Sequence, residues 1–307
     1  MPPSTQAPTL ADLAHTPGAM ELKLSRHVPD GLIGYYEAPA GWLTKRGEPR
    51  LRPYRKYLWT PTGGEAVKLP STSAILEAIC PKPGLAYWSE ERGIEGAVLA
   101  LKAGLIHEGS RAADAVAIVR EHGLGAEAAT ARAAKRGLNV HAINEHYMRT
   151  GEPPRLSDHP VEHHGFLRAW AKATLALDPE PVEVETLIVH PEDGYAGRLD
   201  LRARIGGALE TCEYKTQQRG GIWRSSHWQA LLYERGAVRC GAEPAARCRV
   251  IVLPADGDWT LDRHTMTVAA GDADAALAYW RACRLIDNAC ESRNRAARAS
   301  APNPQEA

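Results

Sequence analysis

The sequence contains a single phenylalanine, against eight tryptophans and ten tyrosines. Tryptophan and tyrosine combine an apolar ring with a polar group, which suits surfaces that stack against another molecule. The chain also lacks an excess of charge of either sign, because 37 Lys and Arg balance 37 Asp and Glu. A neutral total argues against a protein that coats nucleic acid. It is compatible with separate basic and acidic surfaces that cancel in the sum.

Several other features are absent. No Cys-x-x-Cys pair occurs among the six cysteines, which are Cys80, Cys212, Cys240, Cys248, Cys283 and Cys290. Residues 1–20 lack the basic start and apolar run of a signal peptide. No stretch approaches the ~20 apolar residues that a membrane helix needs. We therefore expect a cytoplasmic protein with reduced thiols that does not enter a membrane.

The first half of the chain is expected to be irregular and then helical. Residues 1–20 should be loose, and glycine and proline break residues 20–70 into short strands and loops. A strand is expected at 55–60, before a turn at Gly63-Gly64. Further expected elements are helices at 74–79, 85–106, 110–122, 125–150 and 160–177. We assign residues 21–125 to an N-terminal elaboration that could contact DNA.

The second half changes to an alternating, β-branched pattern. Glycine turns at 193–194 and 206–207 separate segments that resemble strands of a hairpin. The expected elements are strands at 182–190, 195–205, 208–216 and 247–254, and helices at 223–235 and 272–297. This order predicts an α/β fold whose mixed central sheet is flanked by helices. We assign residues 126–299 to this core and 300–307 to a disordered tail.

Three charged residues carry the main chemical signal. Glu213 and Lys215 are two apart on one expected strand, so they share a face. Asp200 lies six residues before the Gly206-Gly207 turn and Glu213 six after it, which should bring the two carboxylates close together. Neighbouring carboxylates repel unless a cation separates them, and Mg²⁺ prefers such oxygen ligands. The alternative is a solvent-facing ion pair, which is common on exposed strands.

These residues also form a pattern that resembles a known family. The segments Gly197-Arg198-Leu199-Asp200 and Glu213-Tyr214-Lys215-Thr216 resemble the PD-(D/E)XK nuclease superfamily, in its RecB-like and phage exonuclease branch. Gln229-Ala-Leu-Leu-Tyr233 and Gly137-Leu-Asn-Val-His141 are similar to two flanking motifs of that branch. Ser71-Thr-Ser-Ala-Ile-Leu resembles the entry segment of its phage members. The likeness covers about residues 130–255.

The resemblance implies a role for each matching residue. Asp200 and Glu213 would bind metal, with the Tyr214 carbonyl as a further ligand, and Lys215 would be the catalytic lysine. His141 would complete the metal shell, and Glu185 could serve a second metal. Side chains expected to orient the lysine or contact the substrate are Gln229, Tyr233 and Arg198. Plainer interpretations remain open, because His141 could simply be packed and Glu183 shares the face of Glu185.

A basic segment offers a candidate DNA surface. Residues 44–59 hold six basic side chains against one acid, Glu48, and the expected DNA contacts among them are Arg50, Arg52, Arg55 and Lys56. Trp42, Tyr54, Tyr57 and Trp59 are interleaved with them. Basic side chains neutralise phosphates and aromatic rings stack on unpaired bases. The alternative is a solvated charge run on an edge strand.

The resemblance implies phosphodiester hydrolysis that depends on Mg²⁺ or Mn²⁺, with an exonuclease acting on DNA ends favoured. A structure-specific endonuclease and a non-catalytic DNA-binding subunit are the alternatives. We expect no iron–sulfur cluster, because cluster ligands usually come in tight spacings that these cysteines lack. No G-x-x-x-x-G-K-[ST] motif occurs. A helicase, recombinase or single-strand-binding protein that worked with it would be a separate chain.

Overall fold

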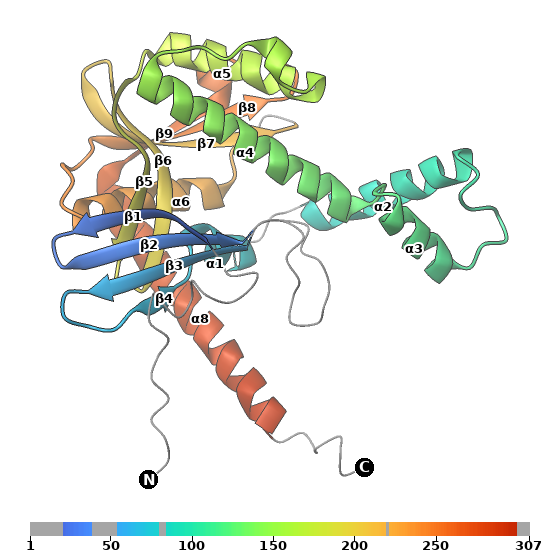
Figure 1. Ribbon diagram of the computed structural model, residues 1–307, viewed down its shortest axis with the longest axis horizontal. Coiled ribbons are helices and arrows are strands. Elements are labelled where there is room, and N and C mark those ends of the chain that lie inside the picture. Colours follow the sequence, from blue (N-terminus) through green and yellow to red (C-terminus); the bar gives the residue numbers. More distant parts are fainter. Residues whose placement is uncertain (1–20, 39–53, 80–83, 219–220, 300–307) are drawn as a thin grey trace.

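The computed structural model describes residues 21–38, 54–79, 84–218 and 221–299, and it is an α/β fold built on two sheets (Figure 1). The larger sheet has five strands in the order β5-β6-β7-β8-β9. Its strands are β5 (Glu180–His190), β6 (Tyr195–Ile205), β7 (Ala208–Gln217), β8 (Arg247–Pro254) and β9 (Thr265–Ala269). Only β7 and β8 run parallel, so the sheet is mixed, as the sequence predicted.

Helices cover both faces of this sheet. A helix between two parallel strands is the usual way to connect them, and α6 (Arg224–Arg239) links β7 to β8. One core cluster joins α6 and α8 (Ala273–Ala299) to the sheet through side chains such as Leu232 and Trp280. A second cluster joins α4 (Ala126–Thr150) and α5 (His164–Leu177) to the opposite side through Phe166 and Trp170.

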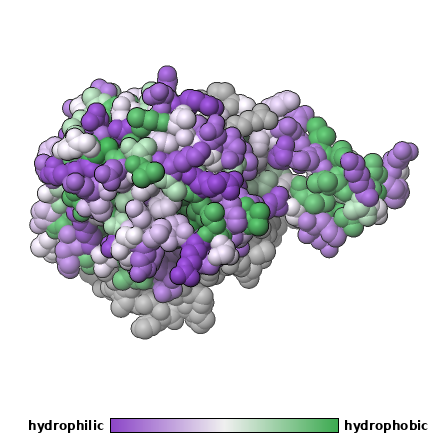
Figure 2. Space-filling view, turned by 90° about the horizontal axis from the view of Figure 1, so that it is seen from above, coloured by the Kyte–Doolittle hydropathy of each residue, from purple (hydrophilic) through white to green (hydrophobic). Residues whose placement is uncertain are grey.

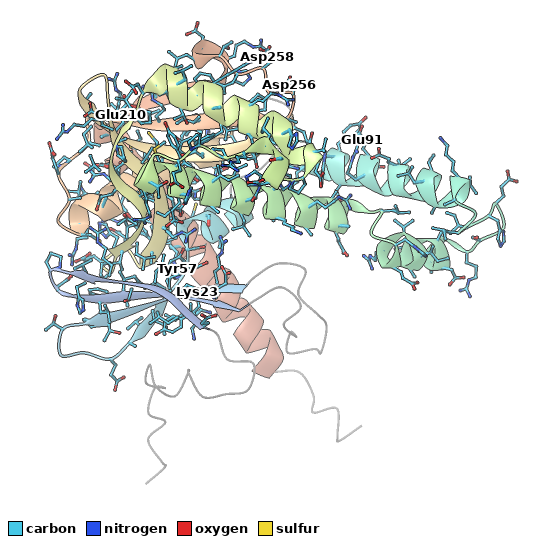
Figure 3. All side chains as sticks on the ribbon, turned by 45° about the horizontal axis from the view of Figure 1, so that its top comes forward. Lys23, Tyr57, Glu91, Glu210, Asp256 and Asp258 are labelled. Atoms are coloured by element: carbon cyan, nitrogen blue, oxygen red, sulfur yellow. The ribbon has the colours of Figure 1, made fainter. Side chains whose placement is uncertain are left out.

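The smaller sheet precedes these elements in the chain. Its four antiparallel strands are β1 (Glu21–Val28), β2 (Gly31–Ala38), β3 (Tyr54–Pro61) and β4 (Val67–Leu69). Ile33, Tyr57 and Trp59 from this sheet belong to the same buried cluster as Leu187 of β5. The two sheets therefore share one core, and Figure 3 shows Tyr57 where they meet.

A helical arm extends from this body. It consists of α2 (Leu85–Lys102), α3 (Ala112–Glu121) and the start of α4, which runs back across the five-stranded sheet (Figure 1). Apolar side chains show on the surface of the arm (Figure 2). The exposed ones are Leu85, Tyr87, Ile94, Val98, Leu99, Leu101 and Val116. The short helices are α1 (Thr72–Ile79), α7 (Leu261–His264), η1 (Leu156–Asp158), η2 (Val161–His163) and η3 (Ala270–Asp272).

The sequence predicted the core elements closely. Gly206 and Gly207 have φ values of 57° and 82°, as a two-residue hairpin turn requires, so β6 and β7 have nearly the predicted limits. The helix expected at 85–106 ends at Lys102, just before Gly104 with φ of 69°. The helix expected at 223–235 continues to Arg239. The edge strand β9 was missed because it has only five residues and is largely exposed, so that its Thr-Met-Thr-Val alternation is too short to predict a strand.

Two further expectations concern thiols and membranes. Cys212, Cys240, Cys248 and Cys283 are buried free thiols, whereas Cys80 and the side chain of Cys290 lie outside the described part. None of the described helices combines the length and apolar character needed to cross a membrane.

Candidate metal centre

Three elements bring together side chains of the types that bind metal ions. His141 comes from α4, Glu185 from β5 and Asp200 from β6. Each offers one ligand atom, and these atoms all lie within 4.8 Å of one another. The two carboxylates are buried, and the imidazole is 24% exposed. An imidazole and two carboxylates within this distance could hold one divalent cation.

Glu185 reaches this position through an unusual backbone conformation. Its φ is +49°, in the left-handed region that non-glycine residues rarely adopt, although its neighbours Val184 and Thr186 pair regularly with β6. This conformation costs roughly 1–2 kcal/mol and persists only where surrounding contacts hold it. Glu185 Oε1 lies 3.3 Å from His141 Nδ1, and Oε2 lies 2.6 Å from Arg198 Nε. Both of its oxygens are therefore engaged.

Asp200 is held from two sides. Its Oδ1 lies 3.4 Å from His141 Nδ1, and its Oδ2 accepts a hydrogen bond of 2.7 Å from the backbone N–H of Tyr214. Burial alone would raise the pKa of Asp200, but His141, Lys215 and this amide outweigh burial and lower it. The carboxylate is therefore ionised and able to bind a cation at neutral pH.

Glu213 and Lys215 point the same way, as their spacing on β7 predicted. Lys215 Nζ lies 2.5 Å from Glu213 Oε1 and donates a hydrogen bond of 3.1 Å to Gln229 Oε1. Gln229 Nε2 in turn donates to the Tyr233 hydroxyl at 3.0 Å. The ring of Tyr233 rests on Gly197, where an added Cβ would come within 2.5 Å of the ring. A chain of contacts thus runs from α6 to the lysine.

Glu213 lies outside the three-residue group, and its second oxygen is unsatisfied. Within the described part of the chain, Oε2 is buried and has no hydrogen-bond partner. Burial, and then the charge of Asp200, raise the pKa of Glu213 to about 8 despite the nearby Lys215. An unpaired buried carboxylate oxygen is costly, so native structures usually give such an atom a partner.

The charge of the centre also acts on His141. Burial alone would lower the pKa of His141, but Asp200 and Glu185 outweigh burial and raise it to about 10. Without a metal, the imidazole therefore carries a proton that partly neutralises the two carboxylates. A divalent cation would do the same with more charge, and a ligating imidazole must first lose its proton.

The remaining candidate residues are placed as follows. The Tyr214 side chain lies in the core, so only its backbone faces the centre. Arg55 Nε lies 3.1 Å from Glu37 Oε2, and Lys56 is half-buried on β3. Arg50 and Arg52 lie outside the described residues.

The aromatic residues of the basic segment correct one expectation. The sequence suggests that Tyr57 and Trp59 could stack on bases, but their side chains are only 6% and 5% exposed and belong to the core shared by the two sheets. The alternation of β3 placed them inward. Tyr35 of β2, which no sequence pattern marked, lies under the guanidinium of Arg198 at 5.7 Å.

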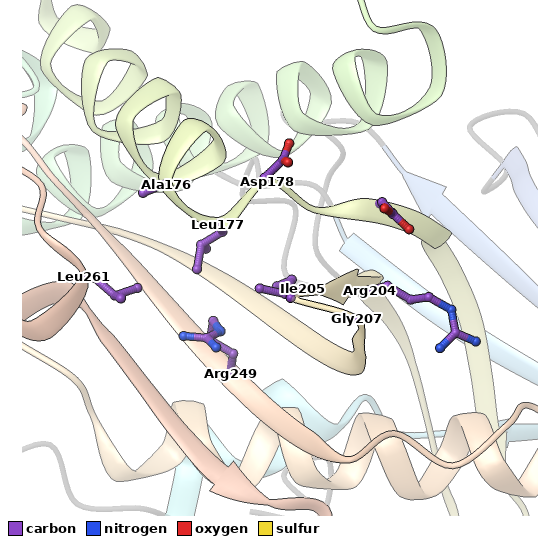
Figure 4. Close-up of a pocket in the computed structure, with 10 residues that line it drawn as sticks. Ala176, Leu177, Asp178, Arg204, Ile205, Gly207, Arg249 and Leu261 are labelled. Carbon is purple, nitrogen blue, oxygen red and sulfur yellow. The ribbon is translucent and has the colours of Figure 1, made fainter.

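A separate cavity of about 410 Å³ lies at the hairpin turn between β6 and β7 (Figure 4). Arg204, Gly206, Gly207 and Arg249 line it, and none of the metal-centre residues does. Arg249 and Arg204 are paired with Glu210 and Glu243, and Asp178 and Glu180 also line the cavity.

Comparison with known proteins does not identify a family for this chain. The chain matches no protein-family model, and no curated protein shows significant similarity to it.

Proposed function

We propose that the protein is a metal-dependent DNA nuclease that hydrolyses phosphodiester bonds, in the manner of the PD-(D/E)XK superfamily that its motifs resemble. The observation that carries the proposal is the group formed by His141, Glu185 and Asp200, whose ligand atoms lie within 4.8 Å of one another. Glu213 and Lys215 lie beside it, and burial or charge alters the pKa of each acid. Altered pKa values of this kind cluster at functional sites.

The donor atoms suit Mn²⁺ or Mg²⁺. Carboxylate oxygens bind both ions, and an imidazole nitrogen binds Mn²⁺ better than Mg²⁺. His141, Asp200 and Glu185 would hold the ion, and the unpartnered Oε2 of Glu213 supports a ligand or proton at that position. A bound ion would supply Lewis-acid activation of the phosphate and a lower pKa for the attacking water.

The residues of the chain would supply the rest of the chemistry. Glu213, with its pKa raised to about 8, could accept a proton from the attacking water near neutral pH. Lys215 Nζ would stabilise the negative charge that develops on the phosphoryl oxygens. Gln229 would orient the lysine through its 3.1 Å hydrogen bond.

The test is a cleavage assay with the purified protein and its Lys215→Ala variant. End-labelled linear single-stranded and double-stranded DNA would be incubated with Mg²⁺, Mn²⁺, Ca²⁺ or EDTA. We expect cleavage with Mg²⁺ and Mn²⁺ only, since Ca²⁺ holds carboxylates at longer distance and in looser geometry. Equal activity in EDTA, or no activity with any substrate, would reject the proposal.

A circular substrate separates the two modes of cleavage. The resemblance favours an exonuclease, which needs an end and would leave closed circular DNA intact. An endonuclease would nick the circle or cut branched DNA at comparable rates. A non-catalytic DNA-binding subunit would bind the linear substrates without shortening them, but it would have no need to keep Asp200, Glu213 and Lys215 together.

A further inference from the structure

Arg198 lies between the metal centre and the N-terminal sheet. It is two residues from Asp200 on β6, and its Nε lies 2.6 Å from Glu185 Oε2. Because Glu185 has a left-handed backbone, its carboxylate needs outside contacts to stay in place. Arg198 supplies the contact on one oxygen, and His141 the contact on the other. The arginine therefore positions a candidate metal ligand.

The N-terminal sheet in turn positions Arg198. The guanidinium lies 5.7 Å from the centre of the Tyr35 ring, and Tyr35 packs against Tyr57 with ring centres 5.3 Å apart. An arginine over an aromatic face is attracted to it electrostatically. The Tyr35 hydroxyl donates to Glu37 Oε2, which also binds Arg55. These contacts fix the wall against which Arg198 rests.

Part of the arginine is still available to a ligand. Its side chain is 26% exposed, its closest ion-pair contact is made by Nε, and no hydrogen bond of Nη1 or Nη2 is found among the described residues. A guanidinium presents its donors as a planar fork that matches two oxygens of a phosphate. Lysine, with one point charge, could not hold Glu185 and a phosphate in the same fixed geometry.

We propose that Arg198 binds a phosphate group of the nucleic acid substrate through Nη1 and Nη2 while its Nε holds Glu185, so that substrate binding and metal binding are coupled. The N-terminal sheet then forms one wall of the site through Tyr35 and Tyr57. This inference rests on the proposed function. Coupling between two ligands is reciprocal, so the metal must strengthen DNA binding by the factor with which DNA strengthens metal binding.

The experiment measures binding rather than cleavage. Ca²⁺ replaces Mg²⁺ so that the DNA stays intact. The affinity for a fluorescent 20-nucleotide DNA is measured by anisotropy with Ca²⁺ and in EDTA, and Ca²⁺ affinity is measured by calorimetry with and without the DNA. The proteins compared are the wild type, Arg198→Lys and Arg198→Gln. We expect Ca²⁺ to tighten DNA binding in the wild type, and both variants to lose that effect.

The proposal also predicts how much DNA affinity the variants lose and which phosphate group is responsible. Both variants should bind DNA at least roughly tenfold more weakly in Ca²⁺, a loss typical of one charged hydrogen bond. Oligonucleotides with a 5′-phosphate and with a 5′-hydroxyl identify the phosphate group. A loss with both assigns Arg198 to the backbone, and a loss with the 5′-phosphate alone assigns it to the DNA end. Wild-type affinity and coupling in both variants would overturn the proposal.

Variants of Tyr35 test separately whether the N-terminal sheet positions Arg198. Tyr35→Phe keeps the ring over Arg198 and loses only the hydroxyl, so Ca²⁺ affinity should stay near that of the wild type. Tyr35→Leu removes the ring and should weaken Ca²⁺ binding severalfold. Tyr36→Leu is the matched control, because Tyr36 is also buried but points to the opposite face of β2. Equal effects of Tyr35→Leu and Tyr36→Leu on Ca²⁺ affinity would show that the Tyr35 ring does not position Arg198.

These outcomes are distinct from those of the cleavage assay. If the chain binds DNA through Arg198 but never cuts it, the proposed function fails and the phosphate site stands. If the chain cuts DNA equally well as wild type and as Arg198→Lys, with unchanged affinities, the reverse is true.

Discussion

Two groups of buried acids lie in and beside the five-stranded sheet, one near the Gly206-Gly207 turn and one further along the strands, and only the first is fully neutralised. At the end near the Gly206-Gly207 turn, Glu210 is completely buried, yet Arg249 holds both of its oxygens at 2.7 and 3.0 Å. Arg247 adds a contact of 2.7 Å. Figure 3 labels Glu210 and also Tyr57, which belongs to the core shared by the two sheets.

Glu234 on α6 belongs to the same neutralised end. It accepts hydrogen bonds from the Thr211 hydroxyl and from the backbone N–H of Ala245, and it forms an ion pair with Arg202. Every oxygen of these two acids has a partner. Removal of one partner from a buried pair of this kind is strongly destabilising, because it leaves the other charge buried without compensation.

The candidate metal centre differs in its balance of charge. Glu185, Asp200 and Glu213 face two permanent cations, Arg198 and Lys215, and Glu213 Oε2 has no partner in the described structure. This shortage of positive charge is consistent with the raised pKa values of His141 and Glu213. The comparison teaches that burial of acids does not by itself point to a function, and that the proposed function rests on the incomplete neutralisation of one group.

The largest expected effect would come from breaking the neutralised end. Glu210→Ala should lower the free energy of unfolding by roughly 3–5 kcal/mol, because it leaves Arg249 buried without its partner. Mn²⁺ affinity should not change. Asp200→Asn should do the opposite, losing Mn²⁺ binding with a small effect on stability. Urea denaturation in EDTA and calorimetry with Mn²⁺ measure both quantities, and similar profiles for the two variants would invalidate the comparison.

A substitution at the candidate metal centre should change the rate of cleavage. Lys215→Ala should reduce cleavage by roughly 100- to 1,000-fold, the range seen when one stabilising donor is removed from an active site. DNA affinity and melting temperature should remain close to those of the wild type. Lys172→Ala is the control, since Lys172 is half-exposed on α5 with only a 3.9 Å contact to Asp258. Cleavage by Lys215→Ala within about tenfold of wild type would contradict the assignment.

A pH titration would sharpen the difference in charge balance. Folding raises the pKa of Glu213 from 4.5 to about 8 and that of His141 from 6.5 to about 10. The folded metal-free protein therefore binds more protons than the unfolded chain, and its stability should fall as the pH rises from about 5 to about 10. The slope is at most about 1.4 kcal/mol per pH unit for each proton.

Denaturation in EDTA at a series of pH values measures this slope. Glu213→Gln should flatten its lower part, and His141→Gln its upper part. Added Mn²⁺ should stabilise the protein more as the pH rises, because the metal then competes with fewer protons. If the free energy of unfolding of the metal-free protein instead rises over this pH range, the acids of the candidate metal centre have enough positive charge around them and the comparison fails.

The sequence alone predicted most helices and strands of the five-stranded core, but fewer of the contacts within the candidate metal centre. Local turn chemistry predicted β6 and β7, and the i and i+2 rule placed Glu213 beside Lys215. Alternation could not distinguish Glu183 from Glu185, because both belong nominally to one strand face. Tertiary contacts decide between them: Glu183 pairs with Arg26 and Arg202, whereas Glu185 turns toward His141.

The N-terminal sheet shows why some features of the candidate site could not be predicted from the sequence. A basic segment with interleaved aromatic residues is typical of a nucleic acid surface, but burial of Tyr57 depends on a second sheet that packs against it. The contact between Arg198 and Tyr35 joins residues 163 positions apart, and no local pattern encodes it. Long-range packing of this kind sets the environment of the candidate metal ligands.

The smallest expected effect concerns the hydrogen bond that orients Gln229. Tyr233→Phe removes the hydroxyl that accepts from Gln229 Nε2 at 3.0 Å, so the amide is less firmly held against Lys215. One neutral hydrogen bond contributes about 1 kcal/mol, so cleavage should slow by roughly fivefold. Tyr195→Phe is a matched control, because it also removes one buried hydroxyl, which donates to the Leu232 carbonyl at 3.0 Å. Both variants should lose similar stability, but only Tyr233→Phe should lose rate, and a rate loss shared equally by the two would make Tyr233 a packing residue alone.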